Sequence, residues 1–219
     1  MKIINPSVEI ISPVDRDFIF KLIEEAGRTA YRSEDKITSD SAPKFVKKIM
    51  ELGHESVIEH YGITSRFIID RGVSHELVRH RLASYTQEST RFCNYEKDKF
   101  GNEISVILPT WAMAPLQDTT KYDMYVDWHS AMLATERAYF TMLKHGATPQ
   151  EARAVLPNAL KTEIVVTANL RELRLILNTR CTKKAHPDMR YIMLKFLDKL
   201  NTLLPEVFND IYKEHFNQL

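Results

Sequence analysis

The spacing of apolar and polar positions predicts a chain built mostly of helices with a few strands. Apolar residues that recur at helical spacing predict helices over residues 18–26, 41–52, 72–82, 122–144, 149–157, 170–179, 189–204 and 207–216. Alternation or β-branched density predicts strands over residues 8–11, 62–70 and 163–168. The expected fold class is α+β, a mostly helical domain with a small mixed or antiparallel sheet.

Two helix ends matter for the later argument. Gly53 is expected to end the second helix, because glycine readily takes the left-handed conformation that follows many helices. The helix over 72–82 would place Arg79-His80-Arg81 at its C-terminal end. Basic side chains there could simply offset the helix dipole, or they could contact ligands on two sides of the helix.

The composition favours one domain and small-molecule ligands. The chain has 219 residues, interpreted as a single domain over 1–219, with 30 basic and 29 acidic residues and a net charge of +1. This balance disfavours a broad basic face for nucleic acid. Two cysteines without a CxxC motif disfavour a disulfide scaffold and a structural zinc site. No apolar stretch approaches membrane-spanning length, so we expect a cytoplasmic protein with no membrane partner.

The most specific pattern is Arg79-His80-Arg81, followed after seven residues by Ser89-Thr90-Arg91. Arginine presents a rigid fork of donors that suits phosphate and carbonyl edges, so this pattern predicts a pocket for phosphorylated, aromatic ligands. The full pattern Arg-His-Arg-x7-Ser-x-Arg resembles the signature of the flavin-dependent thymidylate synthases. Similar segments run from about residue 25 to residue 190, so the resemblance covers most of the chain.

The segment from Gly53 to His60 is rich in groups that bind ligands. Its spacing His54-x5-His60 is wrong for two metal ligands on one helical face, which need a separation of three or four residues. Taken alone, the segment also fits a polar capping turn. It is similar to the family's Gly-His-x-Ser/Thr-x-x-Glu-His segment, which implies that His54, Ser56 and Glu59 contribute to the flavin environment.

Three further positions match the family. Arg153 stands in a segment similar to the family's Ala-Arg-x-x-Leu-Pro, whose arginine contacts the nucleotide. Asn169 and Arg171 resemble the family's Asn-x-Arg, which helps to hold flavin, although Asn169 at a strand-to-helix junction would also serve as an N-cap. Arg180 lies eleven residues past Asn169, the family's spacing for an arginine against the uracil edge.

Ser89 invites two interpretations. No GxSxG elbow surrounds it, and a serine hydroxyl is a poor nucleophile without an adjacent base, a role open to His80 or Glu88. We favour a hydrogen-bonding role for Ser89 toward a phosphate or a pyrimidine, with Arg91 pairing with phosphate.

The resemblance implies reductive methylation of dUMP to dTMP by a homotetramer. 5,10-Methylenetetrahydrofolate would supply the one-carbon unit, and FAD reduced by NADPH would supply the hydride. Arg180 is the expected catalytic residue, and no resident metal is expected. The expected cofactor contacts are His54, Ser56, Glu59, Arg79, His80, Arg81, Gln87, Asn169, Arg171 and Leu175. The expected substrate contacts are Glu76, Leu77, Arg79, Gln87, Ser89, Thr90, Arg91, Arg153 and Arg180.

The chain departs from the family pattern at three positions. Glu76 stands where many relatives have glutamine, and Leu175 and Lys184 stand where some have histidine or asparagine. Leu175 cannot donate a side-chain hydrogen bond, so its role would be apolar or through its backbone.

Two other classes of function remain open at this point. One is a metal-dependent hydrolase that acts through His54, Glu59 and His60. The other is an RNA-binding module that uses the arginines of the central motif, with Tyr85 and Phe92 for base stacking.

Overall fold

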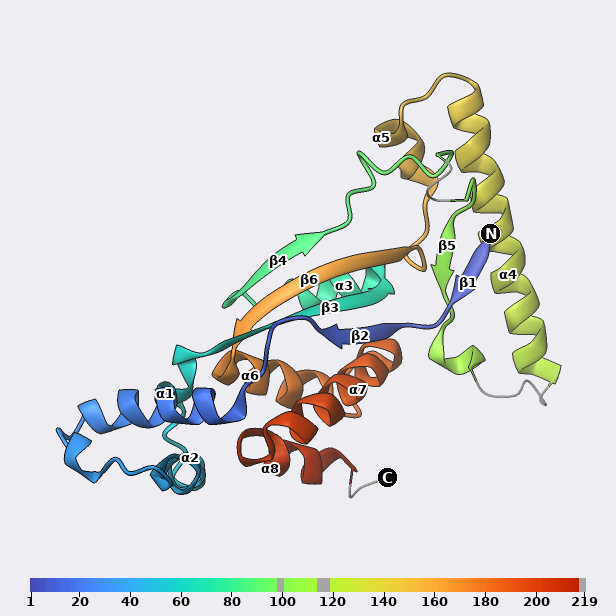
Figure 1. Ribbon diagram of the computed structural model, residues 1–219. Coiled ribbons are helices and arrows are strands. Elements are labelled where there is room, and N and C mark those ends of the chain that lie inside the picture. Colours follow the sequence, from blue (N-terminus) through green and yellow to red (C-terminus); the bar gives the residue numbers. More distant parts are fainter. Residues whose placement is uncertain (98–100, 114–118, 217–219) are drawn as a thin grey trace. The chain divides into compact units, whose positions relative to one another are not determined.

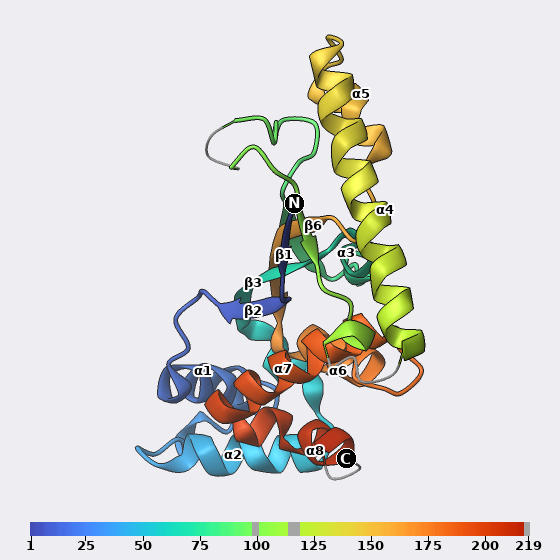
Figure 2. The same cartoon turned by 90° about the vertical axis from the view of Figure 1, so that its right-hand side faces the viewer.

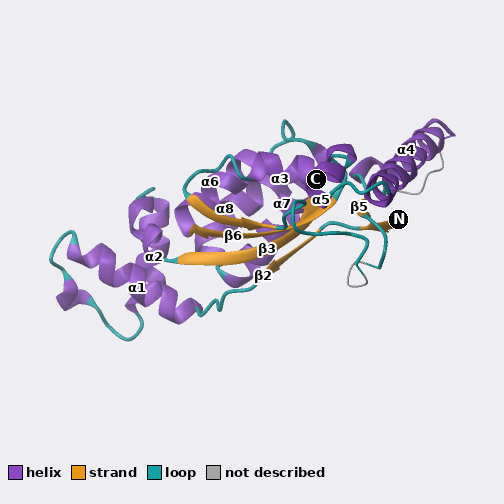
Figure 3. Cartoon of the chain, turned by 90° about the horizontal axis from the view of Figure 1, so that it is seen from above, coloured by secondary structure: helices purple, strands orange, loops and turns teal. Residues whose placement is uncertain are grey.

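The computed structural model describes residues 1–97, 101–113 and 119–216 (Figure 1). Helices predominate over strands, as the colouring in Figure 3 shows, and the predicted α+β class is confirmed. Contacts between Cα atoms divide the chain into two compact units. The first unit comprises Met1–Ser7, Phe67–Arg79 and Thr86–Ile164, and the second comprises Val8–Arg66, His80–Tyr85 and Val165–Leu219. The interpretation of residues 1–219 as one domain stays a prediction.

The larger sheet has four strands in the order β2, β3, β6, β4. Their bounds are Ser7–Ile10, Gly62–Asp70, Lys161–Asn169 and Ala83–Gln87. Strands β3 and β6 run antiparallel, because Leu170 N donates to Tyr61 O at 3.0 Å while Thr64 and Thr167 pair through their hydroxyls at 2.9 Å. The predicted strands 62–70 and 163–168 are confirmed, the first with the same bounds.

Three strands were not predicted. Strand β4 is one, and the others form a two-stranded parallel sheet of β1 (Lys2–Ile4) and β5 (Ser105–Ile107), in which Ile3 lies opposite Val106. The partners β1 and β5 lie a hundred positions apart in sequence, and neither run is long enough to show a period of its own.

The helix predicted over 72–82 is shorter than expected. Helix α3 spans Arg71–Leu77, with the Asp70 carboxylate accepting from Val73 N at 2.7 Å as its N-cap. The Arg79-His80-Arg81 motif therefore lies in the turn between α3 and β4, and its placement at the end of a helix was wrong. The chain leaves the helix early because it must enter strand β4 at Ala83.

The second unit contains most of the helices. These are α1 (Arg16–Thr29), α2 (Ser41–Glu51), α6 (Leu170–Arg180), α7 (Pro187–Leu203) and α8 (Pro205–Phe216), with short 3₁₀ helices η1 (Glu34–Lys36) and η2 (Glu55–His60). Figure 2 shows α1, α2, α7 and α8 gathered together. Their packed faces bury large apolar side chains, among them Phe20, Ile58, Leu177, Phe196 and Phe208.

A buried arginine ties three of these elements together. Arg174 of α6 donates to Glu55 of η2 at 2.8 Å and binds Asp210 of α8 through two nitrogens, at 2.8 and 2.6 Å. It also donates to the backbone oxygen of Val207. Only 7% of its side chain is exposed, so these acceptors compensate a buried charge.

Helices α1 and α2 meet closely at a glycine. A Cβ atom built on Gly27 of α1 would lie 2.5 Å from Phe45 of α2, so only glycine fits that contact without displacing the ring. Gly53 follows α2 with a φ of +69°, which confirms its predicted place at the end of the helix.

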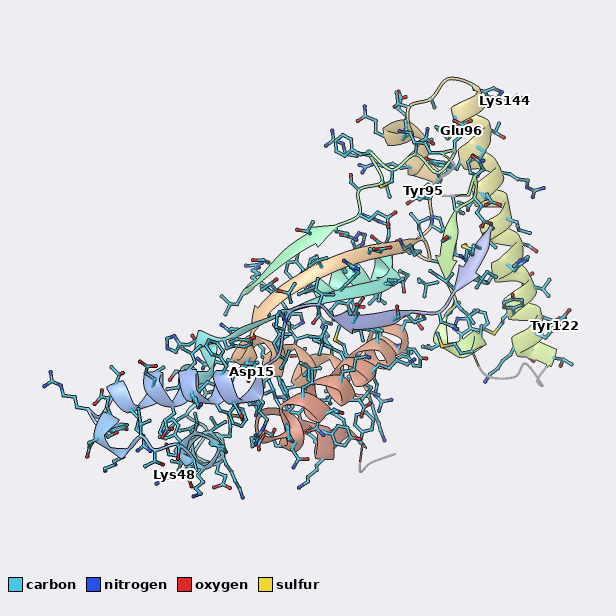
Figure 4. All side chains as sticks on the ribbon, in the orientation of Figure 1. Asp15, Lys48, Tyr95, Glu96, Tyr122 and Lys144 are labelled. Carbon is cyan, nitrogen blue, oxygen red and sulfur yellow. The ribbon has the colours of Figure 1, made fainter. Side chains whose placement is uncertain are left out.

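The first unit has its own core beside the long helix α4 (Thr119–Lys144). Tyr95, labelled in Figure 4, packs edge-on against the buried ring of Tyr139 at 5.6 Å. Pro149 opens helix α5 (Pro149–Ala152), which continues into the 3₁₀ helix η5 (Arg153–Val155) and so matches the short helix expected there. A further 3₁₀ helix, η4, spans Thr110–Ala112.

Among the described residues, no helix combines the length and the apolar character that crossing a bilayer requires.

Candidate active site

The expected cofactor residues and the expected substrate residues lie largely in different units. Most expected cofactor residues belong to the second unit: His54, Ser56, Glu59, His80, Arg81, Asn169, Arg171 and Leu175. Most expected substrate residues belong to the first unit: Glu76, Leu77, Arg79, Gln87, Ser89, Thr90, Arg91 and Arg153. Arg180, the expected catalytic residue, lies in the second unit.

His54 and Ser56 line a cavity of about 870 Å³ in the second unit. The cavity is bounded by the end of α1, by α2 and by the start of η2. Gly53, with its positive φ, lies between α2 and His54, the residue just before η2. The cavity lining includes the cationic side chains of Arg28, Lys36, Lys44 and Lys48. Two of these cations have acidic partners, Lys44 with Asp40 at 2.9 Å and Arg28 with Glu24 at 2.8 Å. Figure 4 labels Lys48 on α2.

The lining of this cavity, the α1–α2 cavity, also contains rings and hydroxyls. Tyr31 and Phe45 supply aromatic faces, with the Arg28 guanidinium 4.8 Å from the centre of the Phe45 ring. Ser33, Thr38 and Ser41 supply hydroxyl groups. A surplus of cations beside flat apolar faces suits a ligand that carries both phosphate and aromatic rings.

Glu59 is paired with an arginine of another element. Its carboxylate accepts from the Arg171 guanidinium on α6, and this pair links η2 to α6. Within residues 1–97, 101–113 and 119–216, no group of three histidine, cysteine or carboxylate side chains is placed to hold a metal ion. Two residues expected at the cofactor, Glu59 and Arg171, are thus brought together.

A smaller pocket, of about 300 Å³, brings Arg81 and Asn169 together. It lies in the second unit, where the segment from Arg81 to Ser84 faces the end of β6. The Asn169 side-chain oxygen accepts from Glu172 N at 2.8 Å, so this residue also serves as the N-cap of α6. Its side-chain amide nitrogen is a separate donor, so capping and ligand binding are compatible.

His80 and Arg180, a hundred residues apart, are in direct contact. Arg180 Nε donates to His80 Nε2 at 3.1 Å, and His80 Nδ1 lies 3.7 Å from the Oε1 atom of buried Glu172. The Tyr85 hydroxyl donates to the His80 backbone oxygen at 2.7 Å. Burial raises the pKa of Tyr85 to about 12, so this phenol stays a donor at neutral pH.

Leu175 projects from the middle of α6 and is 54% exposed. An exposed leucine in a helix whose inner positions are buried offers an apolar contact surface. This placement agrees with the apolar role that the sequence left for it.

The residues after β4 are fixed by the first unit's own hydrogen bonds. Gln87 donates to the hydroxyls of Ser74 and Thr162 at 2.8 and 3.2 Å. Ser89 begins a tight turn, because its backbone oxygen accepts from Phe92 N and Cys93 N at 3.2 and 2.9 Å.

Thr90 and Arg153 meet within the same unit. The Arg153 guanidinium donates to the buried hydroxyl of Thr90 at 3.3 Å, so two expected substrate residues from distant segments lie together. Arg91 is exposed and its guanidinium lies 5.3 Å from the centre of the Phe92 ring.

The remaining expected substrate residues differ in accessibility. Arg79 is exposed and Glu76 is half-buried, whereas the Leu77 side chain lies in the core with 1% exposed. Leu77 could therefore contact a nucleotide only through its backbone.

Two charged residues that the sequence did not mark, Lys161 and Glu172, contact predicted or candidate residues. Glu88 accepts from Lys161 Nζ at 3.0 Å and from Glu163 N at 3.3 Å, which anchors the residue just before Ser89 to β6. Glu172 is 4% exposed and faces His80. An acidic residue in the first turn of a helix is ordinarily a dipole partner, so nothing in the sequence marked Glu172 as special.

Comparisons with known proteins place these features in context. The family model described as "Thymidylate synthase complementing protein" matches residues 17–206. A flavin-dependent thymidylate synthase of Geobacter sulfurreducens is 35% identical over 192 residues, covering 84% of this chain and 78% of its own length. A second flavin-dependent thymidylate synthase, from Pyrococcus furiosus, is 33% identical over 184 residues, which cover 82% of this chain and 70% of its own length.

A solved structure shares the fold. The crystal structure of a UMP/dUMP methylase, PolB, from Streptomyces cacaoi bound with 5-Br dUMP aligns with a TM-score of 0.76 at 19% identity. The alignment covers 95% of this chain and 96% of that one.

Proposed function

Because this chain belongs to the flavin-dependent thymidylate synthase family, we propose that it converts dUMP to dTMP by reductive methylation. 5,10-Methylenetetrahydrofolate is the one-carbon donor, NADPH is the reductant and FAD is the cofactor. The observation that carries the proposal is the contact between His80 and Arg180, because it joins the Arg-His-Arg motif to the arginine expected at the uracil edge.

The α1–α2 cavity is the part of the second unit that fits FAD best. A flavin dinucleotide needs donors for its pyrophosphate and apolar faces for its rings, and the cavity offers both beside His54 and Ser56. Arg81 and Asn169 provide further donors at the smaller pocket. When bound, FAD supplies the hydride chemistry, while the protein binds and orients the reactants.

The first unit would hold the nucleotide. Arg91 is exposed and remains cationic, which suits a phosphate, and the Arg153–Thr90 pair offers a second guanidinium. Ser89 would donate a hydrogen bond to the nucleotide rather than attack it, because its Oγ atom accepts from Arg91 N and the neighbouring carboxylate of Glu88 is engaged by Lys161.

Arg180 would act on the pyrimidine. Methylation requires electron density at C5, and loss of the N3 proton would raise that density by placing negative charge on the N3–C4–O4 edge. A fixed guanidinium stabilises that charge more in the transition state than in the ground state, so it accelerates the step.

We further propose a homotetramer in the cytoplasm, as the family resemblance implies. The metal-dependent hydrolase and the RNA-binding module gain no support: Glu59 is paired with Arg171, and the relatives are thymidylate synthases.

Absorbance and activity assays on the purified protein test the proposal directly. It should be yellow, carry flavin absorbance, and form dTMP from dUMP only when 5,10-methylenetetrahydrofolate and NADPH are both supplied. Protein that binds FAD but forms no dTMP under these conditions would refute the reaction, and hydrolysis that depends on an added metal would support the hydrolase instead.

A further inference from the structure

Glu172, His80 and Arg180 form a continuous line of side chains in the second unit. Glu172 lies in the first turn of α6 and Arg180 is the last residue of that helix. His80, from the turn after α3, lies between them: its Nδ1 atom is 3.7 Å from Glu172 Oε1 and its Nε2 atom is 3.1 Å from Arg180 Nε. The side chains of Glu172 and His80 are 4% and 10% exposed.

The contact with Arg180 indicates on which nitrogen the His80 proton lies in this arrangement. The Nε atom of arginine always carries a hydrogen and is only a donor. His80 Nε2 must therefore be the unprotonated acceptor, so the ring proton lies on Nδ1, on the side that faces Glu172. A charged ring or the opposite tautomer would set two N–H groups against each other.

We propose that Glu172 is a positioning residue for the methylation reaction: its carboxyl selects the His80 tautomer that holds the Arg180 guanidinium in place. The inference rests on the proposed role of Arg180. At 3.7 Å the Glu172 oxygen lies beyond hydrogen-bond distance of Nδ1, but an acidic group so close still favours a proton on that nitrogen by electrostatic attraction. Loss of such outer groups around a functional histidine commonly costs activity although they touch no substrate.

The cost of burying this carboxyl points the same way. Burial raises the pKa of Glu172, which means that the site stabilises its charged form poorly. A well-packed apolar side chain at such a position is often as stable or more stable. Stability alone therefore gives little reason for a glutamate here, whereas an acidic oxygen 3.7 Å from Nδ1 favours the tautomer that carries its proton on that nitrogen.

Two substitutions of Glu172 separate positioning from folding. Glu172→Leu removes the acceptor and should lower kcat roughly 10- to 100-fold, with a smaller change in the KM for dUMP and with FAD content and Tm retained. Glu172→Gln keeps a side-chain oxygen that can lie beside Nδ1 and should retain most of the activity. Glu206→Leu is the control, because it makes the same change at a different glutamate, 21% exposed and paired with Arg16, and should leave kcat unchanged.

The ¹⁵N resonances of His80 give a readout that a merely structural role would not move. In the wild-type holoenzyme the proton should reside on Nδ1, and in Glu172→Leu it should redistribute toward Nε2. A wild-type ring protonated on Nε2 would overturn the inference even if the leucine variant failed to fold. Unchanged kcat in folded Glu172→Leu would also overturn it, and so would a loss of kcat only in parallel with Tm and FAD content. Absence of dTMP formation by the wild-type enzyme would refute the proposed reaction instead, and the tautomer measurement would still report on Glu172.

Discussion

Replacing Arg180 with alanine should separate catalysis from folding. The side chain is half-buried and its Nε atom is held by His80 at 3.1 Å, so the guanidinium is fixed before substrate arrives. Loss of one such preorganised donor lowers kcat by about 100-fold or more, which corresponds to about 2.7 kcal/mol of transition-state stabilisation. A residue that only complements the dipole of α6 would instead contribute about 0.3–1 kcal/mol to stability and nothing to turnover.

The assay is turnover at saturating dUMP, folate and NADPH, with flavin absorbance and Tm measured on the same preparations. Arg180→Ala should lose turnover while keeping its flavin and its Tm. Arg180→Lys should recover only part of the loss, because arginine contacts His80 through Nε and has two more nitrogens, whereas lysine has a single one. Lys183→Ala, an exposed cation just past the same helix, is the control and should behave as wild type.

Near-wild-type turnover in Arg180→Ala would remove Arg180 from the mechanism. A fall in Tm that accounts for the whole loss of activity would assign the residue to the stability of α6 instead.

Three further changes test other parts of the site. Arg79→Ala with Arg81→Ala should yield folded but largely colourless protein, because Arg81 lines the smaller pocket; stoichiometric FAD in this variant would contradict the assignment of these arginines to flavin. Ser89→Ala should weaken dUMP binding and slow turnover yet leave measurable synthase activity, and a covalent adduct trapped on Ser89 together with an inactive alanine variant would be incompatible with this. Arg174→Met should lower the free energy of unfolding by about 2–3 kcal/mol, less than for a fully buried pair because Asp210 keeps 63% of its side chain exposed. Denaturant unfolding beside the exposed control Lys199→Met measures this, and a loss below about 0.5 kcal/mol would show that the network contributes little. Although burial opposes it, Arg174 holds the pKa of Asp210 below its usual value, so this contribution is present at neutral pH and is lost as pH falls through the lowered pKa.

Local signals predicted those elements whose pattern is complete within one segment. The strand over 62–70 alternates buried and accessible positions along its whole length, and Gly53 marks the end of α2 by its backbone conformation. Strand β4 alternates half-buried and exposed positions, but none of its five residues is fully buried and its inward face ends in the polar Gln87, so it shows only a weak apolar face. Its partner is β6, more than seventy residues away, and only that pairing makes the segment a strand.

In the candidate site, too, features carried by one segment were predictable and contacts between distant segments were not. Motif spacing predicted which residues belong to it, and the structure brings together His80 with Arg180, Glu59 with Arg171, and Thr90 with Arg153. Which atom of each side chain is used depends on contacts across distant segments, so neither the approach of Glu172 to His80 nor the contact of Lys161 with Glu88 could be predicted from sequence. The assignment of these residues to cofactor or substrate stays a prediction.

The missing side chain at Gly27 makes the width of the α1–α2 cavity adjustable through a single position. Even a methyl group there would push the Phe45 ring, which forms part of the cavity wall and lies under the Arg28 guanidinium. A larger residue at position 27 would therefore separate the two helices and change the shape of the cavity at the same time. A designer who wished to change which ligand this cavity admits could begin at a residue that contributes no atom beyond its backbone.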